Sequence, residues 1–129
     1  MTVSGNLASG SASLYDGNGY SATVNKSDAN HYNANMTVNG RYYSVQMERY
    51  TGQLNVYGDV SMNFTGDNNY YTASGVSISL NGTSSTISGN GISMSGDLNG
   101  FSGTIYPQDV NDSYAMTAIV SAFVLQNPQ

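Results

Sequence analysis

Apolar and polar side chains alternate on both sides of the dipeptide Asn39-Gly40, over residues 32–47. Asn-Gly suits the two central positions of a tight β-hairpin turn, because both residues there need a positive φ. A two-residue loop pairs Val38 with Arg41, Met36 with Tyr43, Ala34 with Val45 and Tyr32 with Met47. Since strand side chains alternate between faces, this register gathers the apolar set on one face and turns Tyr42 to the other. The pattern therefore predicts an antiparallel hairpin.

A second hairpin is predicted around the two glycines of residues 17–19. A three-residue loop pairs Leu14 with Ala22 and Ala12 with Val24, so that these apolar side chains share one face. A two-residue loop would pair Leu14 with a serine and break that match. The longer loop, with a glycine at its left-handed position, is therefore expected.

Alternation continues along the rest of the chain. Val3 and Leu7 are placed in a short first strand, and residues 48–53 are expected to turn the chain. Residues 54–64 keep their apolar positions on one parity, which predicts one long strand with Gly58 as the place for a bend.

The parity of the apolar positions changes across Gly75, which predicts a β-bulge there. Further turns are expected at residues 66–69, 81–82 and 89–91. Pro107 is expected to end the last alternating strand, and residues 108–113 are expected to form a polar loop.

Residues 114–125 are apolar on both parities, so their pattern alone fits a short helix or a strand buried on both faces. Helical spacing is met by Ala115, Ala118, Ile119, Ala122 and Phe123. The β-branched and aromatic content favours a strand, and every earlier segment reads as β. We therefore expect a strand here, with the helix as the alternative.

Short strands separated by turn signals predict a single all-β domain covering residues 1–129. The architecture is either an antiparallel β-sandwich or a small β-barrel of about eight to ten strands. The pattern does not choose between these two.

Charged residues make up only 9% of the chain, against about a quarter in an average soluble domain. Their place is taken by Ser, Thr, Asn and Gly, a surface composition typical of extracellular, cell-surface or virion proteins. The formal net charge is −5 and the three cations are not clustered, so nucleic-acid binding lacks its electrostatic basis. No signal peptide is visible, and the longest apolar run is too short for membrane insertion.

Candidate catalytic and metal-binding groups are scarce. The chain has no Cys and one His, and His31 has Asp28 as its nearest acid in the sequence. We interpret His31 as a solvent-facing residue, and most aspartates as turn residues, because they neighbour Gly or Asn. Residues 109–112 hold oxygen ligands at a spacing plausible for Ca²⁺ but lack the features of an EF-hand loop. We expect no enzyme activity, no metal site and no cofactor.

Tyrosine carries the main functional signal, because the chain has 11 Tyr and no Trp. Tyr combines apolar area with a hydroxyl group, and suits recognition surfaces rich in Ser, Gly and Asn. In each adjacent pair, at Tyr42-Tyr43 and Tyr70-Tyr71, one ring must face outward. We therefore predict non-catalytic adhesion or recognition of a glycan or other cell-surface ligand, with these contact residues: Tyr20, Tyr42, Tyr70, Tyr71, Asp67, Asn68 and Asn69.

Two alternative functions remain open. Few charges or prolines protect the long alternating segments, so exposed strand edges could pair into a homo-oligomer, filament, fibre or capsid-like assembly. A closed barrel would have no such edges. In the second alternative a small barrel holds an apolar ligand, in a cavity that four methionines could line, namely Met36, Met47, Met62 and Met94.

Overall fold

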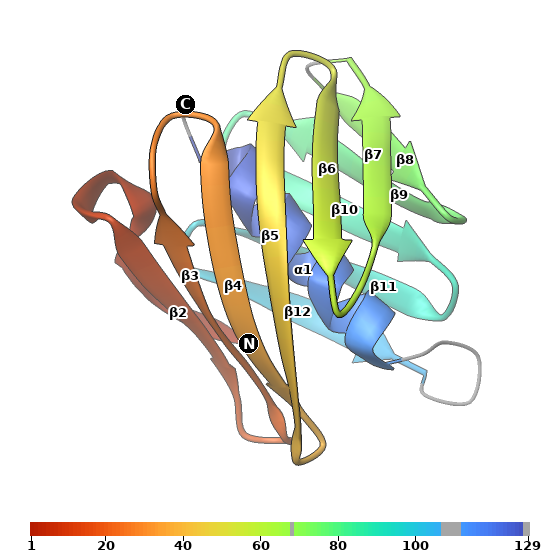
Figure 1. The fold of residues 1–129 in the computed structure, drawn as a ribbon. Helices are drawn as coiled ribbons and strands as arrows, with labels where there is room; N and C mark the ends of the chain where they lie inside the picture. The colour runs from red at the N-terminus through yellow and green to blue at the C-terminus, as the bar shows by residue number, and fades with distance from the viewer. Residues whose placement is uncertain (68, 107–111, 128–129) are drawn as a thin grey trace.

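The computed structural model describes residues 1–67, 69–106 and 112–127. In this part of the chain, twelve antiparallel strands close into a barrel and one α-helix lies inside it (Figure 1). The strands are β1 (Thr2–Asn6), β2 (Ser11–Asp16), β3 (Tyr20–Lys26), β4 (His31–Val38), β5 (Arg41–Tyr50), β6 (Gln53–Gly58), β7 (Met62–Gly66), β8 (Tyr70–Ala73), β9 (Val76–Asn81), β10 (Ser84–Gly89), β11 (Ile92–Asp97) and β12 (Gly100–Ile105). The helix is α1 (Asp112–Gln126), and a short 3-10 helix, η1 (Leu7–Ser9), joins β1 to β2.

Each strand pairs with the strands before and after it in sequence, and β1 closes the ring on β12. Because consecutive strands are antiparallel, the connections alternate between the two ends of the barrel. One end, here the Asn39 end, carries the turns at residues 17–19, 39–40, 59–61, 74–75 and 90–91. The opposite end, the Gly52 end, carries η1 and the turns at residues 27–30, 51–52, 82–83 and 98–99.

Both predicted hairpins are confirmed with their registers. Met36 pairs with Tyr43 and Ala34 with Val45 around a turn in which Asn39 has φ 51° and Gly40 φ 82°. The β2–β3 hairpin also has the expected register. Its apolar pairs are Leu14 with Ala22 and Ala12 with Val24.

The prediction of one long strand over residues 54–64 is wrong. The chain turns at residues 59–61, and β6 and β7 pair Leu54 with Phe64 and Val56 with Met62. A three-residue connection returns the chain with the same parity of apolar positions, so alternation alone cannot separate this hairpin from a continuous strand.

The predicted bulge at Gly75 is also a hairpin turn. Ala73 pairs with Val76, and the two residues between them, Ser74 and Gly75, both have positive φ. A two-residue turn reverses the parity of the apolar positions, and a β-bulge does the same, so the sequence pattern does not distinguish the two. Smaller differences concern Leu7, which lies in η1 rather than in a strand, and the bounds of three turns. The turns expected at residues 48–53, 81–82 and 89–91 lie at 51–52, 82–83 and 90–91.

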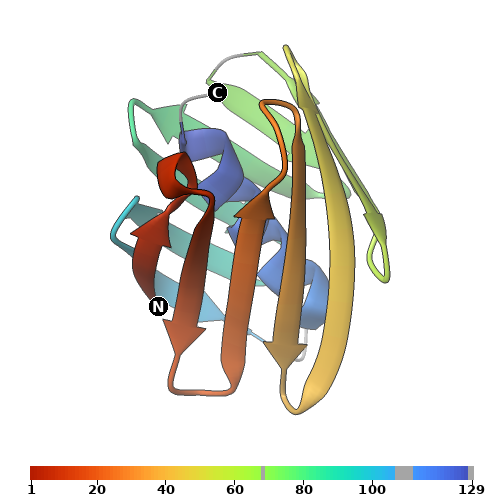
Figure 2. The ribbon, with the colours of Figure 1, turned by 60° about the vertical axis from the view of Figure 1, so that its left-hand side comes forward.

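The strand expected over residues 114–125 is a helix, and it begins at Asp112, inside the expected polar loop. Its side chains are buried on every side except at Tyr114 and Asp112, because the barrel wall surrounds it (Figure 2). A helix buried all round is apolar all round, so it shows no amphipathic period. The buried hydroxyl groups of Thr117 and Ser121 donate to the carbonyl groups four residues earlier, at 2.6 and 2.7 Å.

The all-β prediction is confirmed, and the architecture is a closed barrel rather than a sandwich. Twelve strands exceed the expected eight to ten, because the strand over residues 54–64 and the segment around Gly75 each hide a hairpin. Pro107 and residues 108–111 lie outside the described residues.

Candidate functional site

The predicted contact residues fall into two groups at opposite ends of the barrel. Tyr20 and Tyr42 lie at the Asn39 end, whereas Asp67, Asn69 and the pair Tyr70-Tyr71 lie at the Gly52 end. Asn68 lies outside the described residues. The structure therefore does not bring the predicted residues together into one site.

At the Asn39 end, a hollow lies beside the exposed Tyr15, and a second exposed tyrosine, Tyr42, stands on the next strand beyond its lining. The registers of β2–β5 place Tyr15, Ser21, Thr37 and Tyr42 side by side across four neighbouring strands. The Tyr15 and Tyr42 side chains are 64% and 74% exposed, and Ser21 and Thr37 lie between them. Neighbouring strands are about 4.8 Å apart, so the two tyrosine backbones are roughly 14 Å apart. We call this row and its hollow the tyrosine trough.

The hollow of the tyrosine trough has a volume of about 260 Å³. Of the row, Tyr15, Ser21 and Thr37 line it and Tyr42 does not, and the rest of the lining is Asp16, Gly17, Gly19, Tyr20 and Gly40. Asp16 is the charged residue of this lining, which contains no Lys or Arg. Asp16 accepts a hydrogen bond from the Asn18 backbone N–H at 2.9 Å, which holds the turn at residues 17–19.

The floor of the tyrosine trough is tied to the helix inside the barrel. Tyr20 is 9% exposed, and its hydroxyl group donates to Asp112 Oδ2 at 3.2 Å, in the first turn of α1. Asn39 Nδ2 donates to the same oxygen at 2.6 Å. Burial, with the nearby Asp112 carboxylate as a second cause, raises the pKa of Tyr20. Tyr20 therefore acts mainly as a support that positions the turn of Asn39.

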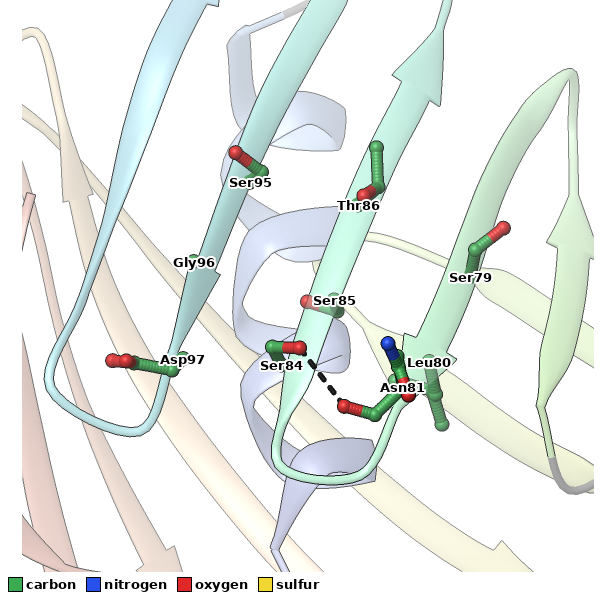
Figure 3. A pocket seen from close by; sticks show the side chains of 9 residues that line it. All are labelled: Ser79, Leu80, Asn81, Ser84, Ser85, Thr86, Ser95, Gly96 and Asp97. Carbon is green, nitrogen blue, oxygen red and sulfur yellow. Dashed lines mark hydrogen bonds between the residues drawn. The ribbon is translucent and has the colours of Figure 1, made fainter.

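A second hollow, of about 360 Å³, lies on the outer face of β9, β10 and β11 near the Gly52 end (Figure 3). The registers place Ser79, Thr86 and Ser95 in one row across the three strands. Asn81, Ser84 and Asp97 border the same hollow closer to the turns. We call this surface the hydroxyl trough.

Tyr70 lies beside the hydroxyl trough, because it pairs directly with Ser79. Its side chain is 47% exposed, and its hydroxyl group donates to Ser77 Oγ at 3.0 Å. Tyr71 is 6% exposed and points into the barrel, where burial raises the pKa of its phenol. Asp67 Oδ1 accepts the backbone N–H groups of Asn69 and Tyr70, so Asp67 holds this turn.

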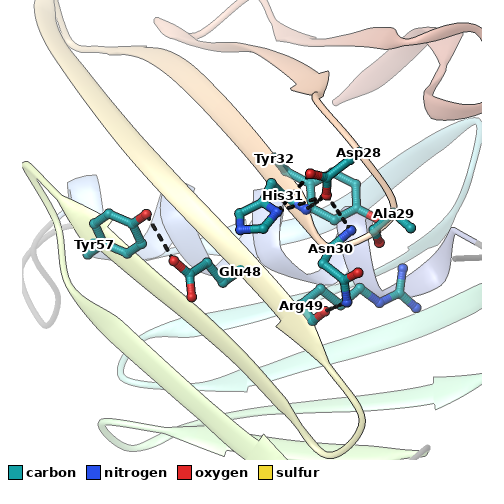
Figure 4. A network of polar contacts seen from close by, with 8 residues as sticks. All are labelled: Asp28, Ala29, Asn30, His31, Tyr32, Glu48, Arg49 and Tyr57. Atoms are coloured by element: carbon teal, nitrogen blue, oxygen red, sulfur yellow. Dashed lines mark hydrogen bonds and ion pairs between the residues drawn. The ribbon is translucent and has the colours of Figure 1, made fainter.

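A polar cluster on β4–β6 includes the histidine of the chain (Figure 4). His31 Nδ1 lies 2.8 Å from Asp28 Oδ1, and that oxygen also accepts the backbone N–H groups of Asn30 and His31. These contacts, chiefly the Asn30 N–H followed by the His31 side chain, lower the pKa of Asp28. Each contact stays within residues 28–31, so the arrangement supports a role in holding that loop.

Glu48 pairs with His31 across the strands, and its Oε1 accepts a hydrogen bond from the Tyr57 hydroxyl group at 3.2 Å. Among the described residues, no group of three or more His, Cys, Asp or Glu is placed to hold a metal ion. In the same part of the chain, no helix is both long and apolar enough to cross a membrane.

Comparison with family models, curated proteins and solved structures found no match to this chain.

Sequence reasoning did not select Tyr15 or the row of Ser79, Thr86 and Ser95. The signal for Tyr15 was present, because the predicted register of the 17–19 hairpin turned Leu14 inward and hence Tyr15 outward. The row of hydroxyl groups requires the β9–β10–β11 registers. Those registers depend on where the turns between the strands lie, and the alternation of apolar and polar residues alone does not fix these positions.

Proposed function

We propose that this protein is a non-catalytic recognition module that binds glycans through the tyrosine trough. The observation that carries the proposal is the row in which Tyr15 and Tyr42 flank the hydroxyl groups of Ser21 and Thr37. A sugar ring presents an apolar face and polar edges. An exposed phenol ring packs on the apolar face of the sugar, and hydroxyl, amide and carboxylate groups form hydrogen bonds with its polar edges. The low charge of the chain supports an extracellular or cell-surface setting.

The structure offers less support for the two alternative functions. Every described strand pairs on both sides, so the edges that polymerisation would require are absent from this part of the chain. Helix α1 lies where an apolar ligand would have to bind. Met36 packs against it, within 3.9 Å of the Thr117 hydroxyl group. The side chains of α1 and the inward-facing residues of the strands thus form one hydrophobic core.

The test is binding of the whole chain to a glycan array, followed by calorimetry on the strongest ligand. We expect Tyr42→Ala to weaken binding about tenfold, or roughly 1.4 kcal/mol. Tyr42→Phe should keep most of the affinity, because the ring face remains. Tyr50→Ala is the matched control, because Tyr50 is an exposed tyrosine at the other end of the same strand. A blank array, or equal affinity of Tyr42→Ala and wild type, would overturn the proposal.

A further inference from the structure

We propose that the hydroxyl trough is a second saccharide site, so that one molecule binds two neutral glycan chains on opposite walls of the barrel. This inference extends the proposed function and rests on it. The second hollow, on β9–β11, shares none of its lining residues with the hollow of the tyrosine trough (Figure 3).

The two troughs have the same construction. Registered pairs place Tyr70, Ser79, Thr86 and Ser95 side by side across β8–β11, as they place Tyr15, Ser21 and Thr37 across β2–β4. In both rows a half-exposed or exposed tyrosine stands at one end of a run of hydroxyl groups. In the hydroxyl trough, the bond from the Tyr70 hydroxyl group to Ser77 holds the phenol ring along the neighbouring strand.

The charge of the two linings indicates the class of saccharide. Each lining holds one acidic residue, Asp16 in the tyrosine trough and Asp97 in the hydroxyl trough, and neither holds Lys or Arg. A sugar hydroxyl group can donate a strong hydrogen bond to a carboxylate. A sulfate, carboxylate or phosphate on the sugar would instead face a like charge with no cation to pair with it. The geometry therefore points to neutral glycans at both troughs.

The position of the troughs explains what two sites would do. In the ring order of the barrel, β10 lies about half a turn from β3 and β4, so the two surfaces face in opposite directions (Figure 2). They also lie towards opposite ends of the barrel, the tyrosine trough at the Asn39 end and the hydroxyl trough at the Gly52 end. One short oligosaccharide cannot reach both. A protein with this arrangement would cross-link separate glycan chains, and binding to a polymer would gain from two attachments.

The test uses the whole chain with three neutral polysaccharides, a branched mannan, a linear β-glucan and a galactomannan, and with heparin as the acidic probe. Light scattering is followed over a range of protein-to-polymer ratios. We expect at least one neutral polymer to form cross-linked particles that dissolve at excess polymer, and heparin to form none. Calorimetry with a trisaccharide of the same sugar should count two sites on each chain.

Variants assign the sites. Thr86→Val combined with Ser95→Ala removes two hydroxyl groups from the hydroxyl trough and should abolish cross-linking, leaving one trisaccharide site. Thr104→Val is the matched control, because Thr104 is an exposed threonine of β12 outside both linings, and it should cross-link like wild type. Tyr70→Ala is a second probe of the same trough and leaves its strand hydroxyl groups in place. Circular dichroism establishes that each variant is folded.

The outcomes separate this inference from the proposed function. Loss of all binding in Tyr42→Ala, with no effect of the Thr86, Ser95 or Tyr70 changes, would overturn the second site and leave the first. Loss of binding only in the hydroxyl-trough variants would overturn the tyrosine trough as the glycan site and make this protein monovalent. Binding of heparin in preference to the neutral polymers would overturn the neutral class. Absence of binding to any polymer would overturn both.

Discussion

Asp28 shows how a single carboxylate organises a loop at the barrel surface. Its Oδ1 atom accepts the backbone N–H groups of Asn30 and His31 at 2.8 and 2.9 Å, and the His31 ring contacts both carboxylate oxygens (Figure 4). All of these donors favour the ionised form, so the pKa of Asp28 lies below its ordinary value. The carboxylate thus stabilises the folded state when it is charged.

This pKa direction predicts a pH dependence for the variant Asp28→Ala. A lowered pKa in the folded state contributes stability above the unfolded value of about 3.9, and that stability is lost as the pH falls through the folded pKa. We therefore expect wild type to be more stable than Asp28→Ala at pH 7 and pH 5, and the difference to shrink at about pH 3. Urea unfolding at these three pH values measures it. A difference that stays constant across them would contradict the assignment.

At the scale of elements, α1 depends on contacts that are remote in sequence. Its C-terminal carbonyl groups are bound by Arg49 of β5, whose Nη1 donates to Val124 O at 2.8 Å and to Asn127 O at 2.7 Å. Nη2 donates to Leu125 O at 3.2 Å. A guanidinium at this position satisfies the last carbonyl groups and interacts favourably with the negative end of the helix dipole.

We predict that Arg49→Ala lowers the free energy of unfolding by about 2–4 kcal/mol, because buried carbonyl groups lose a charged donor. Arg49→Lys should recover only part of the lost free energy of unfolding, since an ammonium group does not reproduce the planar fork of donors. Arg41→Ala is the control, because Arg41 is an exposed arginine on the same strand, and it should stay within about 0.5 kcal/mol of wild type. Urea unfolding at pH 7 provides the values. Equal losses for the two arginines would refute a specific role for Arg49.

The same elements show how far the sequence predicts the fold. The hairpin at Asn39 was predictable with its register, because turn chemistry and apolar alternation agree there. The hairpin hidden in residues 54–64 was not, since an odd-length turn preserves parity. The helix over Asp112–Gln126 could be predicted only as the alternative to a strand, because a segment buried on every side is apolar at both spacings. The surrounding barrel overrides its β-branched content.

The candidate site was likewise predictable only in part, within single hairpins whose register the sequence gives. Tyr42 was predictable as an outward residue from its own hairpin, and its exposure of 74% confirms that orientation. Its neighbour Thr37 belongs to the same hairpin, but Ser21 and Tyr15 come from β3 and β2, so recognising the row requires the β3–β4 register as well. Tyr20 and Tyr71 lie in β3 and β8, close to turns that contain Gly, Asn or Asp, yet both side chains are buried. Composition indicates which residues could form a recognition surface, whereas strand registers decide which of them meet.

At the scale of the whole molecule, the barrel is not paired equally all the way round. Among the described residues, eight registered pairs join β4 to β5 and seven join β3 to β4, whereas two join β7 to β8 and one joins β1 to β12. The β1–β12 contact is supplemented by the bonds from Val3 N–H to Asn99 O and from Phe101 N–H to Met1 O. The ring therefore has two weakly paired seams, and a strongly paired wall that carries the tyrosine trough.

This unequal pairing predicts the order in which the native barrel opens. Segments with few backbone hydrogen bonds open at lower free energy than the rest of the molecule. We expect amide hydrogens at the β1–β12 and β7–β8 seams to exchange with solvent at least tenfold faster than those within β3–β5 and α1. Hydrogen exchange followed by nuclear magnetic resonance at several low urea concentrations measures each amide. Uniform protection around the ring would show that the barrel opens only as a whole. Faster exchange in β3–β5 would show that the trough wall, rather than a seam, is its weakest part.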